Sequence, residues 1–69
     1  MGVTYKKLFK LLIDRKMKKK DLQESVGISP ATMAKLSKDE YVSMDIVVKI
    51  CNVLNVDIGD ILEIDQQQE

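Results

Sequence analysis

The chain has 69 residues, a formal net charge of zero and 45% hydrophobic residues, enough for one small domain with its own core. No apolar run approaches the roughly 20 residues of a membrane-spanning helix, so we expect no membrane partner. Histidine is absent and cysteine occurs once, which excludes Ser-His and Cys-His nucleophile pairs and most zinc sites. We therefore expect no metal, no cofactor and no small-molecule substrate; a site built from carboxylates alone is the enzyme alternative left open.

The expected compartment follows from the cysteine and from the N-terminus. Cys51 has no second cysteine with which to form an internal disulfide, which is typical of a reducing compartment. The first residues, "MGVTYKKLFKLLIDRK", carry charges through their apolar part and lack a signal-peptide cleavage pattern. Both observations predict a cytoplasmic protein.

A first helix is predicted close to the N-terminus. Thr4 can cap it, and it should run to about Arg15 or Lys16. Its apolar residues recur at helical spacing: Tyr5, Leu8, Phe9, Leu12 and Ile13. A short second helix over about 19–26 follows, with Gly27 placed to end it in a left-handed conformation.

The proline in "GISPATMAKLSK" lies within an otherwise helical stretch, where a helix interior would lose about 3 kcal/mol to it. Ser29 is a good N-cap, and Pro30 then falls at the first helical position, where its missing N–H is not needed. Pro30 therefore predicts the start of a third helix, with Met33 and Leu36 on its buried side.

Two more helices are expected after the polar connection "SKDEYVS". Ser43 can cap the fourth helix and Asn55 can end it. Its apolar positions are Ile46, Val47, Ile50, Val53 and Leu54. Asp57 can cap a short fifth helix that directs Ile58, Ile61 and Leu62 inward. We expect an all-α domain over 1–64, with five helices and no sheet, and a polar C-terminal tail over 65–69.

The charges are divided between the two halves of the chain. Residues 1–38 hold ten lysines and arginines against three acids, and residues 39–69 hold one lysine against eight acids. Such a division indicates a basic binding face and an acidic far side, whereas the alternative is a merely uneven surface. Lys18, Lys19 and Lys20 stand at the predicted start of the second helix, where the helix dipole disfavours cations and favours a phosphate.

Two short helices joined at a glycine, the second capped by serine, form a helix-turn-helix pattern. The apolar residues that carry the pattern are Leu22, Val26, Ile28, Met33 and Leu36. From about Tyr5 to Leu62 the chain resembles the Cro/repressor-like (XRE) helix-turn-helix family, and "LNVDIGDIL" is similar to the end of its small members. The resemblance implies a compact five-helix DNA-binding domain and a sequence-specific transcriptional regulator, often a homodimer.

The resemblance also implies positions for the DNA contacts, with the recognition helix (about 30–38) in the major groove of double-stranded DNA. Base contacts are expected from Pro30, Ala31 and Lys35, with the hydroxyl of Thr32 as a further candidate. Phosphate contacts are expected from Lys18, Lys19, Lys20, Ser29, Lys38, Tyr41 and Ser43. The alternative function is an antitoxin or anti-regulator that uses the same fold to bind another protein.

Three positions depart from the family pattern. Lys18 and Lys19 stand where Thr and Gln usually begin the second helix. Gln23 stands where a small residue is common. The loop after the recognition helix reads Asp39-Glu40-Tyr41, where Gly and basic residues are common, and two acids there would repel a phosphate.

Overall fold

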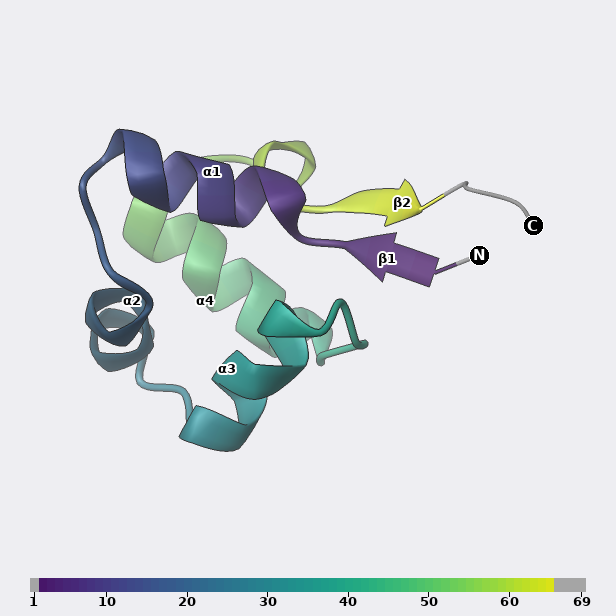
Figure 1. Cartoon of the computed structure of the whole chain (residues 1–69), viewed down its shortest axis with the longest axis horizontal. Helices are drawn as coiled ribbons and strands as arrows, with labels where there is room; N and C mark the ends of the chain where they lie inside the picture. The colour runs from purple at the N-terminus through teal and green to yellow at the C-terminus, as the bar shows by residue number, and fades with distance from the viewer. Residues whose placement is uncertain (1, 66–69) are drawn as a thin grey trace.

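A computed structural model describes residues 2–65 of the chain as a small helical domain with a two-stranded sheet at one end (Figure 1). Its elements, in chain order, are β1 (Gly2–Thr4), α1 (Lys6–Asp14), α2 (Lys19–Val26), α3 (Pro30–Ser37), α4 (Met44–Leu54), the 3-10 helix η1 (Ile58–Asp60) and β2 (Glu63–Asp65). In Figure 1, α1 runs above α4, while α2 lies at the lower left of the view and α3 at the bottom. None of the described helices is long and apolar enough to cross a membrane.

The prediction of five helices without a sheet is wrong. The described residues form four α-helices, and β1 pairs antiparallel with β2, so that Val3 lies opposite Ile64. Strands of three residues are too short to show an alternating pattern, and they meet only because the chain returns to its N-terminal end after α4. Asp65, the first residue of the predicted tail, pairs with Gly2, and residues 66–69 lie outside the described part of the chain.

The predicted fifth helix is a single 3-10 turn, η1. The Asp57 carboxylate accepts a hydrogen bond from the Ile58 N–H at 2.8 Å, and the Asp60 carboxylate accepts one from the Asp57 N–H at 3.0 Å. The predicted cap is therefore present, but the segment ends after three residues. Ile61 is buried as predicted, whereas Ile58 is exposed.

Most of the predicted helix ends are found where the cap residues indicated. Gly27 ends α2 with φ of 81°, and Asn55 ends α4 with φ of 57°. Ser29 and Ser43 accept hydrogen bonds from the N–H groups of Thr32 and Ile46. At the first helix the N-cap position belongs to Tyr5 rather than Thr4, whose hydroxyl accepts only a long contact of 3.4 Å from the Lys6 N–H.

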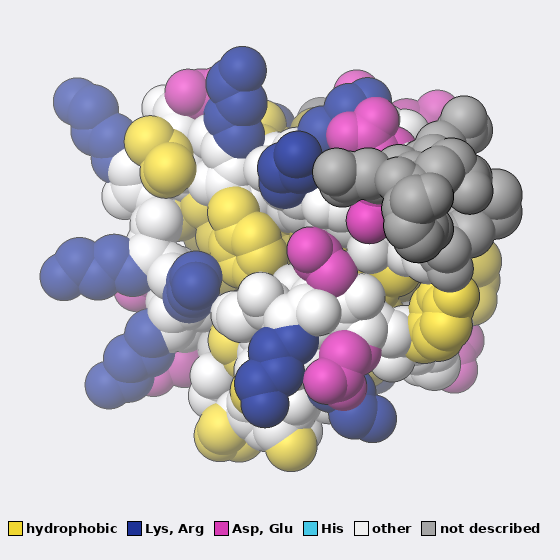
Figure 2. Space-filling model, turned by 45° about the vertical axis from the view of Figure 1, so that its right-hand side comes forward, with side chains coloured by type: hydrophobic (Ala, Val, Ile, Leu, Met, Phe, Trp, Pro, Cys, Tyr) yellow, Lys and Arg dark blue, Asp and Glu magenta, His cyan; other side chains and the backbone are white. Residues whose placement is uncertain are grey.

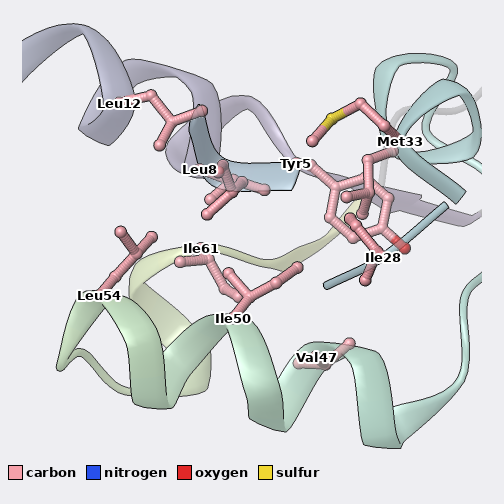
Figure 3. Packing of buried hydrophobic residues seen from close by; sticks show 11 residues of the cluster. Tyr5, Leu8, Leu12, Ile28, Met33, Val47, Ile50, Leu54 and Ile61 are labelled. Carbon is pink, nitrogen blue, oxygen red and sulfur yellow. The ribbon is translucent and has the colours of Figure 1, made fainter. Parts of the chain in front are cut away.

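The core is a single cluster between α1, α4 and the helix-turn-helix. Figure 3 shows Leu8 and Leu12 of α1 facing Ile50 and Leu54 of α4, with Ile61 beside them. A second group at the other end of α4 consists of Tyr5, Ile28, Met33 and Val47. The Arg15 guanidinium donates to the carbonyl of Leu54, joining the end of α1 to the end of α4.

Besides Ile58, two residues predicted for the buried faces are exposed. Ile13 on α1 is 75% exposed, and Val53 on α4 is also exposed. Each directly precedes or follows a buried leucine, Leu12 or Leu54, and so is turned by about 100° around its helix. The helical periodicity puts both residues at the edge of an apolar stripe. Which edge of the stripe is buried depends on the helices that pack against it.

Gly27 provides a direct test of the turn. An alanine there would meet no atom within 4 Å, so its effect comes from the left-handed backbone alone. We expect Gly27→Ala to lower the free energy of unfolding by about 1–2 kcal/mol, measured by urea denaturation.

Gly59→Ala is the matched control, because its Cβ would also meet open space and its φ is not positive. We expect Gly59→Ala to change the free energy of unfolding by no more than about 0.5 kcal/mol. Equal losses for both variants would contradict a specific role for the left-handed turn at Gly27.

Candidate nucleic-acid interface

The helix-turn-helix consists of α2, a short turn and α3. Gly27 ends α2, and the Ile28 side chain that follows is 8% exposed and belongs to the core. Ser29 then caps α3, with Pro30 at its first position. The turn is therefore fixed by a left-handed glycine, one buried side chain and one cap, all in consecutive residues.

The outward face of α3 combines small side chains with lysines. Met33 and Leu36 are buried, so the opposite face of the helix carries the exposed Ala31, Lys35 and Lys38. Ala34 is exposed on the same face and had not been predicted as part of the site. The signal that identifies it is helical spacing, because it lies three residues after Ala31 and four before Lys38.

The first turn of α3 holds the other predicted base-contact residues. Pro30 is exposed, whereas Thr32 is half-buried. The Thr32 N–H donates to the Ser29 Oγ at 3.2 Å, and the two hydroxyl oxygens are 3.1 Å apart. Ser29 and Thr32 thus already bond to each other in the cap.

Three lysines stand at the start of α2, and all three are exposed. The Asp21 carboxylate accepts a hydrogen bond from the Lys18 N–H at 3.0 Å, which satisfies one amide of the helix start. The Lys19 ammonium lies 4.8 Å from the centre of the Phe9 ring and 3.4 Å from the Ser37 Oγ. Lys19 therefore connects α1, the start of α2 and the end of α3.

The positive charge of this region is available to a ligand. Lys18, Lys20, Lys35 and Lys38 form no ion pair within residues 2–65. Figure 2 shows Lys and Arg side chains projecting from the left edge of the molecule, the end at which α2 lies in Figure 1. Unpaired lysines at the start of α2 and on the outward face of α3 favour the binding of a polyanion.

A groove along α1 lacks the unpaired lysines of the helix-turn-helix. The groove has a volume of about 400 Å³ and is lined by Lys7, Lys10, Leu11, Asp14, Val56 and Asp60. Its two lysines and two acids oppose each other, and Lys7 is already bonded to the Gly59 carbonyl and paired with Glu63. Within residues 2–65 no three His, Cys, Asp or Glu side chains are grouped to hold a metal ion.

Comparison with known proteins agrees with this geometry. The family model for the Cro/C1-type helix-turn-helix DNA-binding domain matches residues 7–67. The chain belongs to the Cro/C1-type helix-turn-helix family. It is similar to the crystal structure of the transcriptional regulator VanUg, with 53% identity and a TM-score of 0.92 over 96% of this chain and 88% of that one. A search of curated protein sequences finds no match.

In this Cro/C1-type domain the acidic loop after α3 has a structural contact of its own. Asp39 adopts a left-handed conformation with φ of 57°, and its carboxylate accepts the Tyr5 N–H at 3.0 Å. The Tyr5 hydroxyl donates to the carbonyl of Glu40 at 2.8 Å. The unusual residues of this loop thus attach the end of α3 to the start of α1.

Tyr41 and Ser43, two further predicted phosphate contacts, follow Asp39 and Glu40 in the chain. Tyr41 is 70% exposed, and Ser43 is exposed at the N-cap of α4. The Ser43 Oγ accepts the Ile46 N–H at 3.4 Å, leaving other amides of the first turn without a side-chain acceptor among the described residues. Both residues lie in the chain segment that directly follows α3.

The Tyr5 contact has a measurable pH dependence. Burial raises the pKa of the Tyr5 hydroxyl above its ordinary value of 10.0. Because the folded chain holds this proton more tightly than the unfolded chain, the stabilisation is complete below pH 10 and is lost as the pH rises above it. We expect Tyr5→Phe to cost about 1 kcal/mol at neutral pH and to flatten the alkaline decline in the free energy of unfolding.

Tyr41→Phe is the control, since the Tyr41 side chain is exposed and its hydroxyl makes no hydrogen bond within residues 2–65. Urea denaturation of both variants across neutral and alkaline pH gives the comparison. A Tyr5→Phe protein with the wild-type stability and the wild-type pH profile would refute the proposed contact.

Proposed function

We propose that this chain is a sequence-specific transcriptional regulator that places α3 in the major groove of double-stranded DNA. The observation that supports this function is the outward face of α3, where small side chains and unpaired lysines lie next to the lysine-rich start of α2. A helix entering the major groove needs a close approach to base edges and cations near the phosphates. The similarity to VanUg, itself a transcriptional regulator, supports the same function.

In this proposal Lys35 provides the main polar base contact. Its exposed side chain can donate to guanine O6 and N7, the commonest pairing of a lysine with a base. Pro30, Ala31 and the newly identified Ala34 offer only apolar contact, which suits thymine methyl groups. Thr32 contributes less, because its hydroxyl already bonds within the Ser29 cap.

Phosphate contacts then come from both sides of α3. Lys18 and Lys20 at the start of α2 and Lys38 at the end of α3 are exposed and unpaired within residues 2–65. Ser29, Tyr41 and Ser43 add hydroxyl groups next to helix starts, where free amides favour an anion. Lys19 holds α2 against α1 and α3 through Phe9 and Ser37, so that it can reach a phosphate from a fixed position.

One recognition helix of this size reads few base pairs, so we propose that the regulator binds as a homodimer. Two copies would occupy two half-sites about 34 Å apart along the duplex. The antitoxin or anti-regulator alternative predicts instead a protein ligand and no DNA sequence preference.

Selection from a random duplex pool at two salt concentrations tests the function. We expect recovery of a motif with two-fold symmetry and an affinity that falls steeply as salt rises. Absence of binding at low salt would overturn the proposed function and favour the protein-binding alternative.

Two lysine variants separate base reading from phosphate binding. We expect Lys35→Ala to cost about 1–3 kcal/mol on the selected site and to relax preference at one base step. Lys19→Ala should weaken all sequences alike and reduce the salt slope, with a small loss of stability from its contacts to Phe9 and Ser37.

Lys7→Ala is the charge-matched control, because Lys7 pairs with Glu63 and lies outside α2 and α3. Fluorescence anisotropy on selected and scrambled duplexes measures all three variants. If Lys35→Ala and Lys19→Ala both behaved like Lys7→Ala, the assignment of these contacts would be wrong.

A further inference from the structure

We propose that the outward face of α4 binds the same face of a second copy of this chain, with the two helices antiparallel about a two-fold axis near Val48. The proposal deepens the proposed function and rests on it, since it names the surface through which two copies would occupy paired half-sites.

The first observation is an exposed apolar strip along α4. Met44 is 60% exposed and Val48 is 49% exposed, and the two lie one turn apart on the same side of the helix. The strip borders the buried face of α4, because Met44 lies three residues before the buried Val47.

The second observation is the charge beside this strip. Lys49 is the one basic residue among residues 39–69, in a half of the chain that holds eight acids. It lies one turn after Asp45, and both side chains are exposed next to Val48. Neither forms an ion pair within the described part of the chain.

These charges make the face complementary to itself. When two α4 helices pair antiparallel about an axis that passes between positions 45 and 49, Asp45 of each copy lies opposite Lys49 of the other. The two Val48 side chains then meet near the axis, and the Met44 side chains flank them. A purely acidic or purely basic face would repel a second copy instead.

The size of the face indicates a weak dimer in solution. The 11 residues of α4 extend over about 16 Å, and one helix face of this length is smaller than the roughly 800 Å² per partner of a stable interface. Two half-sites on one duplex would hold the copies at a high effective concentration and complete the contact. We therefore expect concentration-dependent dimers without DNA and cooperative binding with it.

Charge exchange tests the pairing directly. Asp45→Lys alone and Lys49→Asp alone each place like charges opposite one another, and we expect each to weaken dimerisation by at least about tenfold. The double variant Asp45→Lys/Lys49→Asp restores both pairs, and its dimerisation should return to within about threefold of wild type. Sedimentation velocity over a concentration series measures the association, and binding to duplexes with one and two half-sites measures cooperativity.

The controls separate association from folding. Asp14→Lys changes the same charge on the exposed end of α1, outside the proposed face of α4, and should leave dimerisation unchanged. A lysine in the first turn of α4 lowers stability, and thermal unfolding measures this loss. Asp45→Lys and the double variant share the loss. Recovery in the double variant alone therefore reflects the paired contact.

The outcomes are decisive for this face. A wild-type chain that stays monomeric at high concentration and on paired half-sites would overturn the proposal, as would a double variant that does not recover. Dimers unaffected by all three changes would assign self-association to another surface and overturn it as well. Charge-dependent dimers without any DNA binding would support this face and refute only the proposed function.

Discussion

Burial of Ile28 between the helices is the constraint on which the recognition surface depends. This side chain follows the left-handed Gly27 directly and points toward Tyr5 and Val47 (Figure 3). Ile28 anchors the start of α3 in the core. Rotation of α3 about its own axis would also expose the buried Met33 and Leu36. The outward orientation of Ala31 and Lys35 is therefore a consequence of what the opposite side of α3 buries.

A second attachment acts at the other end of α3. Asp39 and Glu40 bind Tyr5 through a side-chain carboxylate and a backbone carbonyl. Tyr5 itself lies between β1 and α1, so the sheet, the first helix and the end of the recognition helix meet at one buried ring. This contact gives a structural reason for an acid at position 39, where a free carboxylate would repel a phosphate. The Asp39 carboxylate accepts a hydrogen bond from the Tyr5 N–H.

A chain without net charge can present a basic surface because ten of its eleven basic residues lie within residues 1–38. The lysines of α2 and α3 remain unpaired within residues 2–65, while Lys7 pairs with Glu63 from the acidic end. Lys49 on α4 is the exception in the acidic half, and its place beside Asp45 and Val48 makes the face of α4 different from the rest of that half. The proposed DNA contacts lie on α2, α3 and the segment up to Ser43, and the proposed self-association surface begins at Met44 on α4.

Local sequence signals are sufficient to predict the helix ends and the helix-turn-helix. Ser29, Pro30, Gly27, Ser43 and Asn55 act through bonds and backbone angles within a few residues, so their effect can be predicted without knowing the fold. The β1–β2 pairing, the exposure of Ile13 and Val53, and the bond between Asp39 and Tyr5 follow from packing in three dimensions. These features join residues far apart in the chain or depend on which edge of an apolar stripe is covered, and no local pattern records either.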